Sequence, residues 1–289
     1  MKRIVILGCE NSHANRFLQE IKDNPAYSDY EVLGVYSEER EAAEKLSAEF
    51  GTPVLNSYDE AVGMVDGVIV TARHGKNHYK YAKPYISSGI PMFIDKPITV
   101  DCEEAIKFMR ELLDAGVTVT GGSSLGKADE IIDLAKKVSE NFEGETLGGV
   151  VRAPLQNDSV HGGFYFYAQH LVEMVTAVFG RYPRSVKAFS AGREKTVVFR
   201  YEKYDVTGIF TDHSFKYFAA RFSEEGSQGG VVVSSDNWFK REFADFDELM
   251  NGGGQKISLD DFIAPVFIMR AIEKSLDSGD EEIIETFRV

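Results

Sequence analysis

Two titratable side chains occupy positions in this chain where they could take part in chemistry. Lys96 lies in the stretch Asp95-Lys96-Pro97, directly after an apolar run that predicts a buried strand. His170 lies behind the pair Gly162-Gly163, in a stretch whose pattern predicts a helix. Because an imidazole titrates near neutral pH, His170 is suited to accept a proton from a hydroxyl group. The alternative is a histidine of the hydrophobic core, which is common on an aromatic helix.

The predicted helix around His170 places other polar and aromatic groups beside it. Phe166, Tyr167 and Glu173 share its face, because residues three or four apart are neighbours on a helix. His161, His170 and Glu173 do not have the spacing of a recognised metal-ligand signature, so we expect no metal site.

The stretch after the first predicted strand keeps only part of a phosphate-binding pattern. A dinucleotide fold has Gly-x-Gly-x-x-Gly at this point, and here only the first glycine, Gly8, is present. Ala14 is small enough for close packing near the third position. A carboxylate at Glu10 would repel a pyrophosphate unless it pointed away.

The helix that follows Gly8 still offers an anion site at its N-terminus. Asn11 or Ser12 would cap this helix, and its free N–H groups would face an anion. Gly8, Asn11, Ser12 and His13 are therefore candidate cofactor contacts. The alternative is an ordinary strand–helix turn.

The end of the second predicted strand bears on the choice between NAD and NADP. Folds that prefer NAD usually carry an acidic residue there for the ribose hydroxyls, whereas this chain has Ser37 followed by Glu38, Glu39 and Arg40. Ser37 and Arg40 could serve a 2′-phosphate, but Glu38 could bond the ribose diol and repel that phosphate. We expect NAD rather than NADP, with an acidic first helical turn as the structural alternative.

A polar loop follows Thr71, at the end of another predicted buried strand. It carries four cationic or titratable groups that would suit an anionic ligand: Arg73, His74, Lys76 and His78. The alternative is a polar surface loop without a ligand.

Strands alternate with helices in the first part of the chain, which predicts a parallel, doubly wound sheet. The predicted strands are 4–7, 32–36, 53–55, 68–71, 91–94 and 117–121, and the predicted helices are 14–22, 38–50, 58–62, 77–88 and 101–115. Ligands of such a sheet bind at the carboxyl ends of its strands. Gly8, Ser37, Thr71 and Asp95 fall at such ends, so we expect them to line one crevice.

The pattern changes after Gly121-Gly122. Predicted helices cover 129–141, 165–179 and 262–275, and predicted strands cover 186–191, 196–201, 206–210, 217–223 and 229–233. Successive strands without long crossovers predict a largely antiparallel or mixed sheet with a few helices. We interpret 226–230 and 252–254 as turns or loops, because both are rich in glycine.

Composition excludes several classes of protein. A hydrophobic fraction of 43 % predicts a packed core, and a net charge of -14 argues against a nucleic-acid partner. No apolar run is long enough to span a bilayer, so we expect no membrane partner. The start of the chain lacks the layout of a signal peptide, and its two cysteines, Cys9 and Cys102, form no recognisable framework. These features predict a cytoplasmic protein.

Taken together, these stretches resemble the Gfo/Idh/MocA oxidoreductases, which bind a nicotinamide dinucleotide on a Rossmann domain. Members carry Glu-Lys-Pro where this chain has Asp95-Lys96-Pro97. They carry a Gly-Gly pair before a histidine, matched by His170, and a loop histidine matched by His78. An aspartate of the family pattern falls at Phe166 and is missing, and Glu173 replaces a later aspartate.

The resemblance implies a Rossmann domain over residues 1–121 and a C-terminal α+β domain over residues 122–289. It implies that Lys96 reaches the reacting oxygen and that His170 acts as acid or base, with Tyr167 as a second candidate. The loop with Thr71, His74 and His78 would cover the cofactor, and Asp95 would help to position it. The open face of the C-terminal sheet would form a homodimer or a higher homo-oligomer.

Two functions remain open on this reading. The first is an NAD(P)-dependent oxidoreductase that moves a hydride between the nicotinamide and a sugar, cyclitol or similar polyol, and it is favoured by Lys96 and His170. The second is a non-catalytic sensor or regulator that binds a nucleotide or sugar, and it is favoured by the altered glycine loop and by Phe166. We take the oxidoreductase as the prediction.

Overall fold

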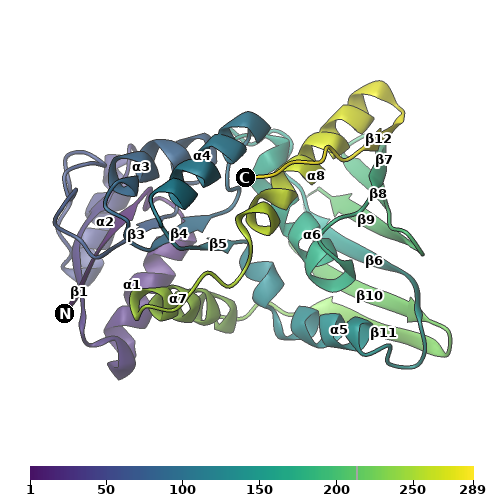
Figure 1. Cartoon of the computed structure of the whole chain (residues 1–289), viewed down its shortest axis with the longest axis horizontal. Helices are drawn as coiled ribbons and strands as arrows, with labels where there is room; N and C mark the ends of the chain where they lie inside the picture. The colour runs from purple at the N-terminus through teal and green to yellow at the C-terminus, as the bar shows by residue number, and fades with distance from the viewer. Residues whose placement is uncertain (213) are drawn as a thin grey trace. The chain divides into compact units, whose positions relative to one another are not determined.

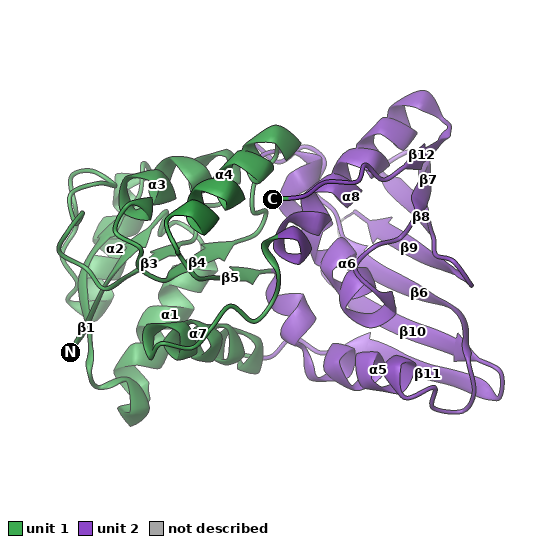
Figure 2. Cartoon of the chain, in the orientation of Figure 1, with its two compact units in different colours: residues 1–122, 236–259, 289 green, residues 123–235, 260–288 purple. Residues whose placement is uncertain are grey.

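The computed structural model describes residues 1–212 and 214–289, which divide into two compact units (Figure 2). The first unit contains residues 1–122, 236–259 and 289, and the second contains residues 123–235 and 260–288. The domains expected from the sequence, 1–121 and 122–289, remain a prediction. The compact units differ from that division chiefly because residues 236–259 return to the first unit.

The first unit is built on a parallel sheet of five strands in the order β2-β1-β3-β4-β5 (Figure 1). The strands are β1 (Lys2–Leu7), β2 (Tyr30–Tyr36), β3 (Gly67–Val70), β4 (Met92–Asp95) and β5 (Val119–Gly122). The connecting helices are α1 (Ser12–Asp23), α2 (Arg40–Phe50), α3 (Lys76–Ile86) and α4 (Cys102–Asp114). All residues of β3 and β4 are buried, as expected for strands covered on both faces. The predicted Rossmann-like fold is confirmed.

Two short predicted elements of the first unit are wrong. Residues 58–62 form turns rather than a helix, because so short a segment gains too few hydrogen bonds to offset helix nucleation. The predicted strand at 53–55 is reduced to a single bridge between Val35 and Val54. A short η1 helix (Pro25–Tyr27) leads into β2.

The first unit also contains a helix that the sequence analysis did not identify, α7 (Asn237–Met250). Its buried residues recur at helical spacing and include Trp238, Phe243 and Phe246. Phe243 packs against Phe17 of α1, with ring centroids 5.5 Å apart. This contact places α7 beside α1, the helix whose N-terminus was predicted to face the cofactor.

The second unit is built on a mixed, mostly antiparallel sheet of seven strands in the order β11-β10-β6-β9-β8-β7-β12. Within the described part of the chain, β6 and β9 pair in parallel and the other neighbouring strands of this sheet pair antiparallel. The strands are β6 (Thr146–Pro154), β7 (Ser185–Ala191), β8 (Glu194–Arg200), β9 (Asp205–Thr211), β10 (Tyr217–Ser223), β11 (Gly226–Val232) and β12 (Glu281–Ile283). The helices are η2 (Ser124–Lys127), α5 (Asp129–Ser139), α6 (Phe164–Phe179) and α8 (Leu259–Ser278). The predicted α/β class is therefore confirmed for both units.

The interpretation of residues 226–230 as a loop is wrong, since they belong to β11. Glycines are tolerated there because β11 pairs along its full length with β10 and lies at the edge of the sheet. Gly229 comes close to the neighbouring strand: a Cβ on it would lie 2.1 Å from the carbonyl oxygen of Ala219. This close approach excludes any larger residue at that position.

Helices α5 and α6 cover one face of the second sheet (Figure 1). Gly208 of β9 and Gly149 of β6 make room for α6, because a Cβ on them would lie 2.8 Å from Leu171 and 2.1 Å from Phe179. On the opposite face, the strand register aligns one row of side chains: Phe189, Thr196, Ile209, Arg152, Phe218 and Val231. Phe189 and Val231 are 52 % and 61 % exposed, so this open face is partly apolar.

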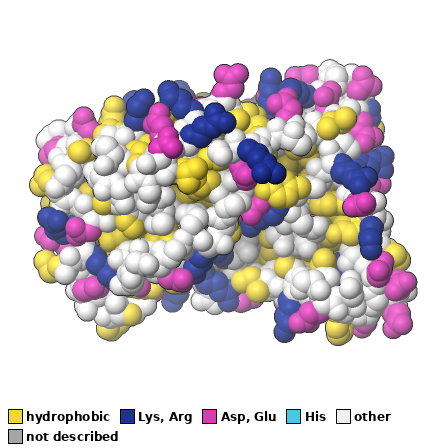
Figure 3. All heavy atoms as spheres, viewed as in Figure 1, with side chains coloured by type: hydrophobic (Ala, Val, Ile, Leu, Met, Phe, Trp, Pro, Cys, Tyr) yellow, Lys and Arg dark blue, Asp and Glu magenta, His cyan; other side chains and the backbone are white. Residues whose placement is uncertain are grey.

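Acidic and basic side chains are interspersed on the face of the protein shown in Figure 3. Among the described residues, no helix combines the length and apolar character that crossing a membrane requires.

Candidate functional site

The carboxyl ends of the first four strands of the first unit bring the predicted cofactor residues together. Gly8 follows β1 with a φ of 77°, and a Cβ on it would lie 2.4 Å from Cα of Ala72, so only glycine fits this turn. The Thr71 hydroxyl donates a hydrogen bond of 3.1 Å to the Gly8 carbonyl. The loops after β1 and β3 are therefore fixed to each other.

Helix α1 begins beside this junction. Asn11 is its N-cap, and its side-chain oxygen accepts from the backbone N–H of Ser12. The Asn11 amide nitrogen also donates a hydrogen bond of 2.8 Å to the Asp95 carboxylate. The first turn of α1 contains no acidic residue, so the helix N-terminus keeps its attraction for an anion.

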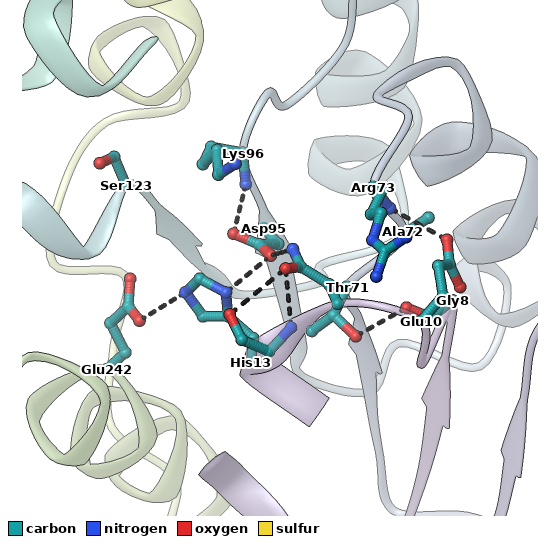
Figure 4. A network of polar contacts seen from close by, with 12 residues as sticks. Gly8, Glu10, His13, Thr71, Ala72, Arg73, Asp95, Lys96, Ser123 and Glu242 are labelled. Atoms are coloured by element: carbon teal, nitrogen blue, oxygen red, sulfur yellow. Dashed lines mark hydrogen bonds and ion pairs between the residues drawn. The ribbon is translucent and has the colours of Figure 1, made fainter. Parts of the chain in front are cut away.

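The side chain of His13 lies inside the unit, between two carboxylates (Figure 4). Its Nδ1 is 3.0 Å from Asp95 and its Nε2 is 3.1 Å from Glu242 of α7. The side chains of His13, Asp95 and Glu242 are 4 %, 0 % and 1 % exposed. We refer to these three residues as the buried charge network. A contact of His13 with the cofactor stays a prediction; in the structure both of its ring nitrogens face buried carboxylates.

Electrostatics keep the buried charge network ionised. Burial by itself would lower the pKa of His13, but Asp95 and Glu242 outweigh that effect and raise this pKa to about 10. Burial would raise the pKa of Asp95, but the His13 imidazolium and the Lys96 ammonium hold it below its usual range. At neutral pH the network therefore contains an imidazolium between two carboxylates.

Lys96 follows Asp95 at the end of β4. Its backbone N–H donates a hydrogen bond of 2.7 Å to the Asp95 carboxylate (Figure 4). Its side chain is buried, and burial lowers the pKa of its ammonium group, while Asp95 and Glu242 offset part of this effect. A lysine with a lowered pKa gives up a proton more readily than an exposed one, which suits it to hold or protonate a reacting oxygen.

Glu10 is directed away from the first turn of α1. Its carboxylate accepts a hydrogen bond of 2.7 Å from the Ser37 hydroxyl, at the end of β2. It also accepts one of 3.0 Å from the backbone N–H of Arg73, toward which the carboxylate turns in Figure 4. The repulsion expected between Glu10 and a pyrophosphate at the helix N-terminus is reduced by this orientation.

The charged residues after β2 are engaged with one another. Glu38 forms an ion pair of 2.6 Å with Lys80 of α3, and the hydrogen bond from Lys80 lowers the pKa of Glu38 despite partial burial. Arg40, the first residue of α2, lies 3.0 Å from Glu44 in the same helix. Ser37 is connected to the loops after β1 and β3 through the Glu10 carboxylate.

The two loop histidines differ in their surroundings. His74 accepts a hydrogen bond of 3.3 Å at Nδ1 from the backbone N–H of Lys76, at the exposed start of α3. His78 is fully buried, and its Nε2 is 2.8 Å from the Ala72 carbonyl. Burial lowers the pKa of His78, which keeps the imidazole neutral. This geometry gives His78 the task of fixing the loop.

The second unit contains the other predicted catalytic residues. His170 of α6 is buried, and its Nδ1 is hydrogen bonded at 2.7 Å to the hydroxyl of Ser123, which fixes the direction of the ring. The ring of Tyr167 lies 5.2 Å from that of His170, and burial raises the pKa of Tyr167. His170 is therefore held by a defined polar partner.

Phe166 and Glu173 show what replaces the two aspartates of the family pattern. Phe166 packs between the rings of His161 and Tyr167, with centroids 5.3 Å and 5.0 Å away. Glu173 forms an ion pair of 3.2 Å with Arg181. Apolar packing thus stands where the family has its inner carboxylate. Among the described residues, no cluster of His, Cys, Asp and Glu could hold a metal ion.

Sequence analysis missed the role of Glu242 in this site and the direction taken by Glu10. A sequence signal for Glu242 exists, because it is a carboxylate on the apolar face of an amphipathic helix, among Trp238, Phe243 and Phe246. A buried carboxylate needs a charged or hydrogen-bonding partner. The partner itself could not be read from the sequence.

The residues of the first unit fit a nicotinamide dinucleotide on three observations. Gly8 forms the tight turn, accessible to glycine, that a dinucleotide loop requires. The N-terminus of α1 carries no acidic residue and is suited to a pyrophosphate. Glu10 points away from that N-terminus, toward Ser37 and the backbone of Arg73. Ser12 and the loop after Thr71 would hold the phosphates, and Lys96 would lie on the reacting side.

The first unit thus has a Rossmann-like fold, and the second is an α+β unit. Residues 2–123 match the model of the Gfo/Idh/MocA family, described as an oxidoreductase family with an NAD-binding Rossmann fold. The resemblance predicted from the sequence is confirmed over this part of the chain. A search of curated protein sequences finds no significant match.

Solved structures share the fold over nearly the whole chain. A myo-inositol 2-dehydrogenase from Lactobacillus plantarum has a TM-score of 0.85 at 15 % identity, covering 98 % of this chain and 99 % of its own. A scyllo-inositol dehydrogenase from Lactobacillus casei, with bound NAD(H) and scyllo-inositol, has a TM-score of 0.83 at 13 % identity and covers 99 % and 100 %. A myo-inositol dehydrogenase from Corynebacterium glutamicum ATCC 13032 has a TM-score of 0.81 at 16 % identity and covers 99 % and 100 %. At these identities the likeness establishes the fold.

Proposed function

We propose that this protein is an NAD-dependent oxidoreductase that interconverts a hydroxyl and a carbonyl group of a cyclitol, sugar or similar polyol. The observation that carries the proposal is Lys96, which is presented at the end of β4 by Asp95 and the buried charge network. The match of residues 2–123 to an NAD-binding oxidoreductase family and the inositol dehydrogenases of the same fold support it.

The bound nicotinamide would supply the hydride chemistry, and the side chains would manage the oxygen and its proton. The Lys96 ammonium would hold the substrate oxygen and stabilise negative charge that develops on it. His170, oriented by Ser123, would accept the hydroxyl proton during oxidation. Tyr167 is the alternative acid or base, although burial raises its pKa and so keeps its hydroxyl protonated, which suits it to act as an acid rather than as a base.

The first test of this function is cofactor binding. Titration of the purified protein with NADH and NADPH, followed by nucleotide fluorescence and by calorimetry, is expected to give submillimolar binding of NADH. Oxidation of a panel of inositols and sugars would then be followed as NADH absorbance. Binding without turnover of any polyol would favour the sensor function instead, and an absence of dinucleotide binding would contradict the proposal.

The role of His170 has its own test. His170→Asn keeps a polar side chain of similar size but removes the imidazole that would accept the proton. We expect lower turnover and the loss of a near-neutral limb from the pH profile of kcat, with the affinity for NADH unchanged. A variant that kept this limb would exclude His170 as the base.

We also propose that the chain forms a homodimer or higher homo-oligomer through the open face of the second sheet. The supporting observation is the row with Phe189, Ile209, Phe218 and Val231, because soluble proteins rarely leave a large apolar sheet face exposed. Ile209→Glu should give monomers in sedimentation velocity, whereas Leu113→Glu, an exposed change on α4, should not. A wild-type monomer at micromolar concentration would contradict this assembly.

A cytoplasmic location remains part of the proposal. Its support is the small number of cysteines, since Cys9 and Cys102 form no recognisable disulfide framework.

A further inference from the structure

Glu10 occupies an unusual position in the dinucleotide fold. It stands in the loop after β1, where the fold has its second glycine, yet its carboxylate reaches the end of β2. That is where NAD-specific folds place the acidic residue that bonds the adenosine ribose. In this chain the end of β2 carries Ser37, whose hydroxyl donates a hydrogen bond of 2.7 Å to Glu10.

The other acidic residues near the end of β2 form ion pairs with basic side chains. The Glu38 carboxylate is 2.6 Å from the Lys80 ammonium, which, with a smaller effect from Tyr81, lowers the pKa of Glu38. Glu39 is exposed and lies 3.8 Å from Arg73. Glu10 is therefore the carboxylate that connects the end of β2 with the loops after β1 and β3.

Glu10 is both oriented and able to accept further hydrogen bonds. The Ser37 hydroxyl and the Arg73 N–H bind different oxygens of its carboxylate, which fixes its plane. A carboxylate has about four acceptor positions on its two oxygens, so capacity for two hydroxyl donors remains. Its side chain is only partly buried, so a ligand can reach it.

We propose that Glu10 is the specificity-determining acceptor for the 2′- and 3′-hydroxyls of the adenosine ribose, and that it selects NAD over NADP. This assignment deepens the proposed function and depends on it. A ribose diol would donate to the Glu10 carboxylate, with Ser37 as the residue that orients it. A 2′-phosphate at the same place would meet a negative charge at short distance, which disfavours NADP.

The test is Glu10→Gln, which keeps an oxygen that can accept from the Arg73 N–H but removes the negative charge. Glu39→Gln is the matched control, since it removes a neighbouring carboxylate that faces Arg73 at 3.8 Å and keeps the backbone N–H that donates to the Ser37 hydroxyl. Dissociation constants for NADH and NADPH would be measured by nucleotide fluorescence. Adenosine monophosphate and adenosine 2′,5′-bisphosphate would be titrated by calorimetry, which reads the adenosine end independently of any reaction.

We expect wild type to bind NADH at least tenfold more tightly than NADPH. Glu10→Gln should reduce this ratio by about tenfold or more, mainly through tighter NADPH binding, and the two adenosine fragments should shift in parallel. Glu39→Gln should change the ratio by less than threefold. An unchanged ratio in folded Glu10→Gln would overturn the assignment.

Two further outcomes separate this inference from the proposed function. If Glu10→Ala binds both dinucleotides where wild type binds neither, Glu10 blocks the site, and this inference fails while the dinucleotide site stands. If neither wild type nor any variant binds a dinucleotide or an adenosine fragment, the proposed function fails, and the assignment of Glu10 fails with it.

Discussion

Replacing His13 by Gln tests the buried charge network directly. The substitution removes the cation that lies 3.0 Å from Asp95 and 3.1 Å from Glu242, and both carboxylates remain in the interior. The difference between an ordinary pKa of 6.5 and a pKa of about 10 corresponds to roughly 5 kcal/mol of interaction in favour of the imidazolium. Breaking a buried ion pair by removing one partner costs about 3–5 kcal/mol, so we expect a loss of that size in the free energy of unfolding.

Equilibrium unfolding in urea at pH 7 would measure this loss. Trp238 is the single tryptophan of the chain, is buried, and belongs to the same helix as Glu242, so its fluorescence reports on the first unit. Adding Glu242→Gln to His13→Gln removes one of the two uncompensated carboxylates and should restore a large part of the loss. Glu242→Gln alone leaves His13 paired with Asp95 and should cost less than His13→Gln, which provides a measurable variant if the latter does not fold.

The pH dependence of stability gives a second measurement with a definite sign. The folded-state pKa of His13 is raised, so its contribution is fully present below the unfolded value near 6.5 and is lost as the pH rises toward 10. In His13→Gln the carboxylates lack this cation, so their pKa values should rise and the variant should gain stability as the pH falls from 8 to 5. Three results together would refute an ionised network. They are a loss of unfolding free energy below about 1 kcal/mol in His13→Gln, no recovery in the double variant, and parallel curves of stability against pH for wild type and His13→Gln.

Three further changes test other parts of the structure. Ser12→Asp should weaken NADH binding about tenfold in calorimetry by placing a negative charge at the N-terminus of α1. The fold should survive, because a carboxylate in the first turn of a helix is favourable, and unchanged affinity would make this loop purely structural. Lys96→Met should lower kcat at least a hundredfold while the Kd for NADH stays within threefold, and a near-normal kcat would remove Lys96 from the chemistry. Arg221→Met should lower the free energy of unfolding by roughly 3 kcal/mol, because the fully buried Arg221 donates hydrogen bonds of 2.6 Å to the carbonyls of Phe142 and Gly144. Urea unfolding followed by circular dichroism would measure this loss. A loss under 1 kcal/mol would show that water replaces the guanidinium as the partner of these carbonyls.

Local patterns were sufficient to predict the parallel sheet and the location of its functional end. Short apolar strands that alternate with helices can bury both faces only in a doubly wound arrangement, and the chain direction alone then places Gly8, Ser37, Thr71 and Asp95 at the carboxyl ends. The alternation along β7 to β10 likewise predicted the second sheet, because a period of two is a property of each strand by itself.

The incorrect secondary-structure predictions concern segments whose structure depends on contacts with distant parts of the chain. Residues 226–230 are glycine-rich and have little strand preference of their own, and they form β11 because β10 provides a full set of hydrogen-bond partners. Residues 58–62 had a helical pattern too short to be stable without such support.

The sequence by itself therefore determined the class of fold, the strand that presents Lys96 and the helix that carries His170, since these follow from periodicity and chain direction. Only the tertiary structure decided that α7 returns to the first unit and brings Glu242 against His13, and that Glu10 turns toward Ser37 and the backbone of Arg73. The physical reason is that the position and direction of a buried charge are set by the partner that compensates it. That partner is supplied by another segment of the chain, whose approach no local pattern encodes.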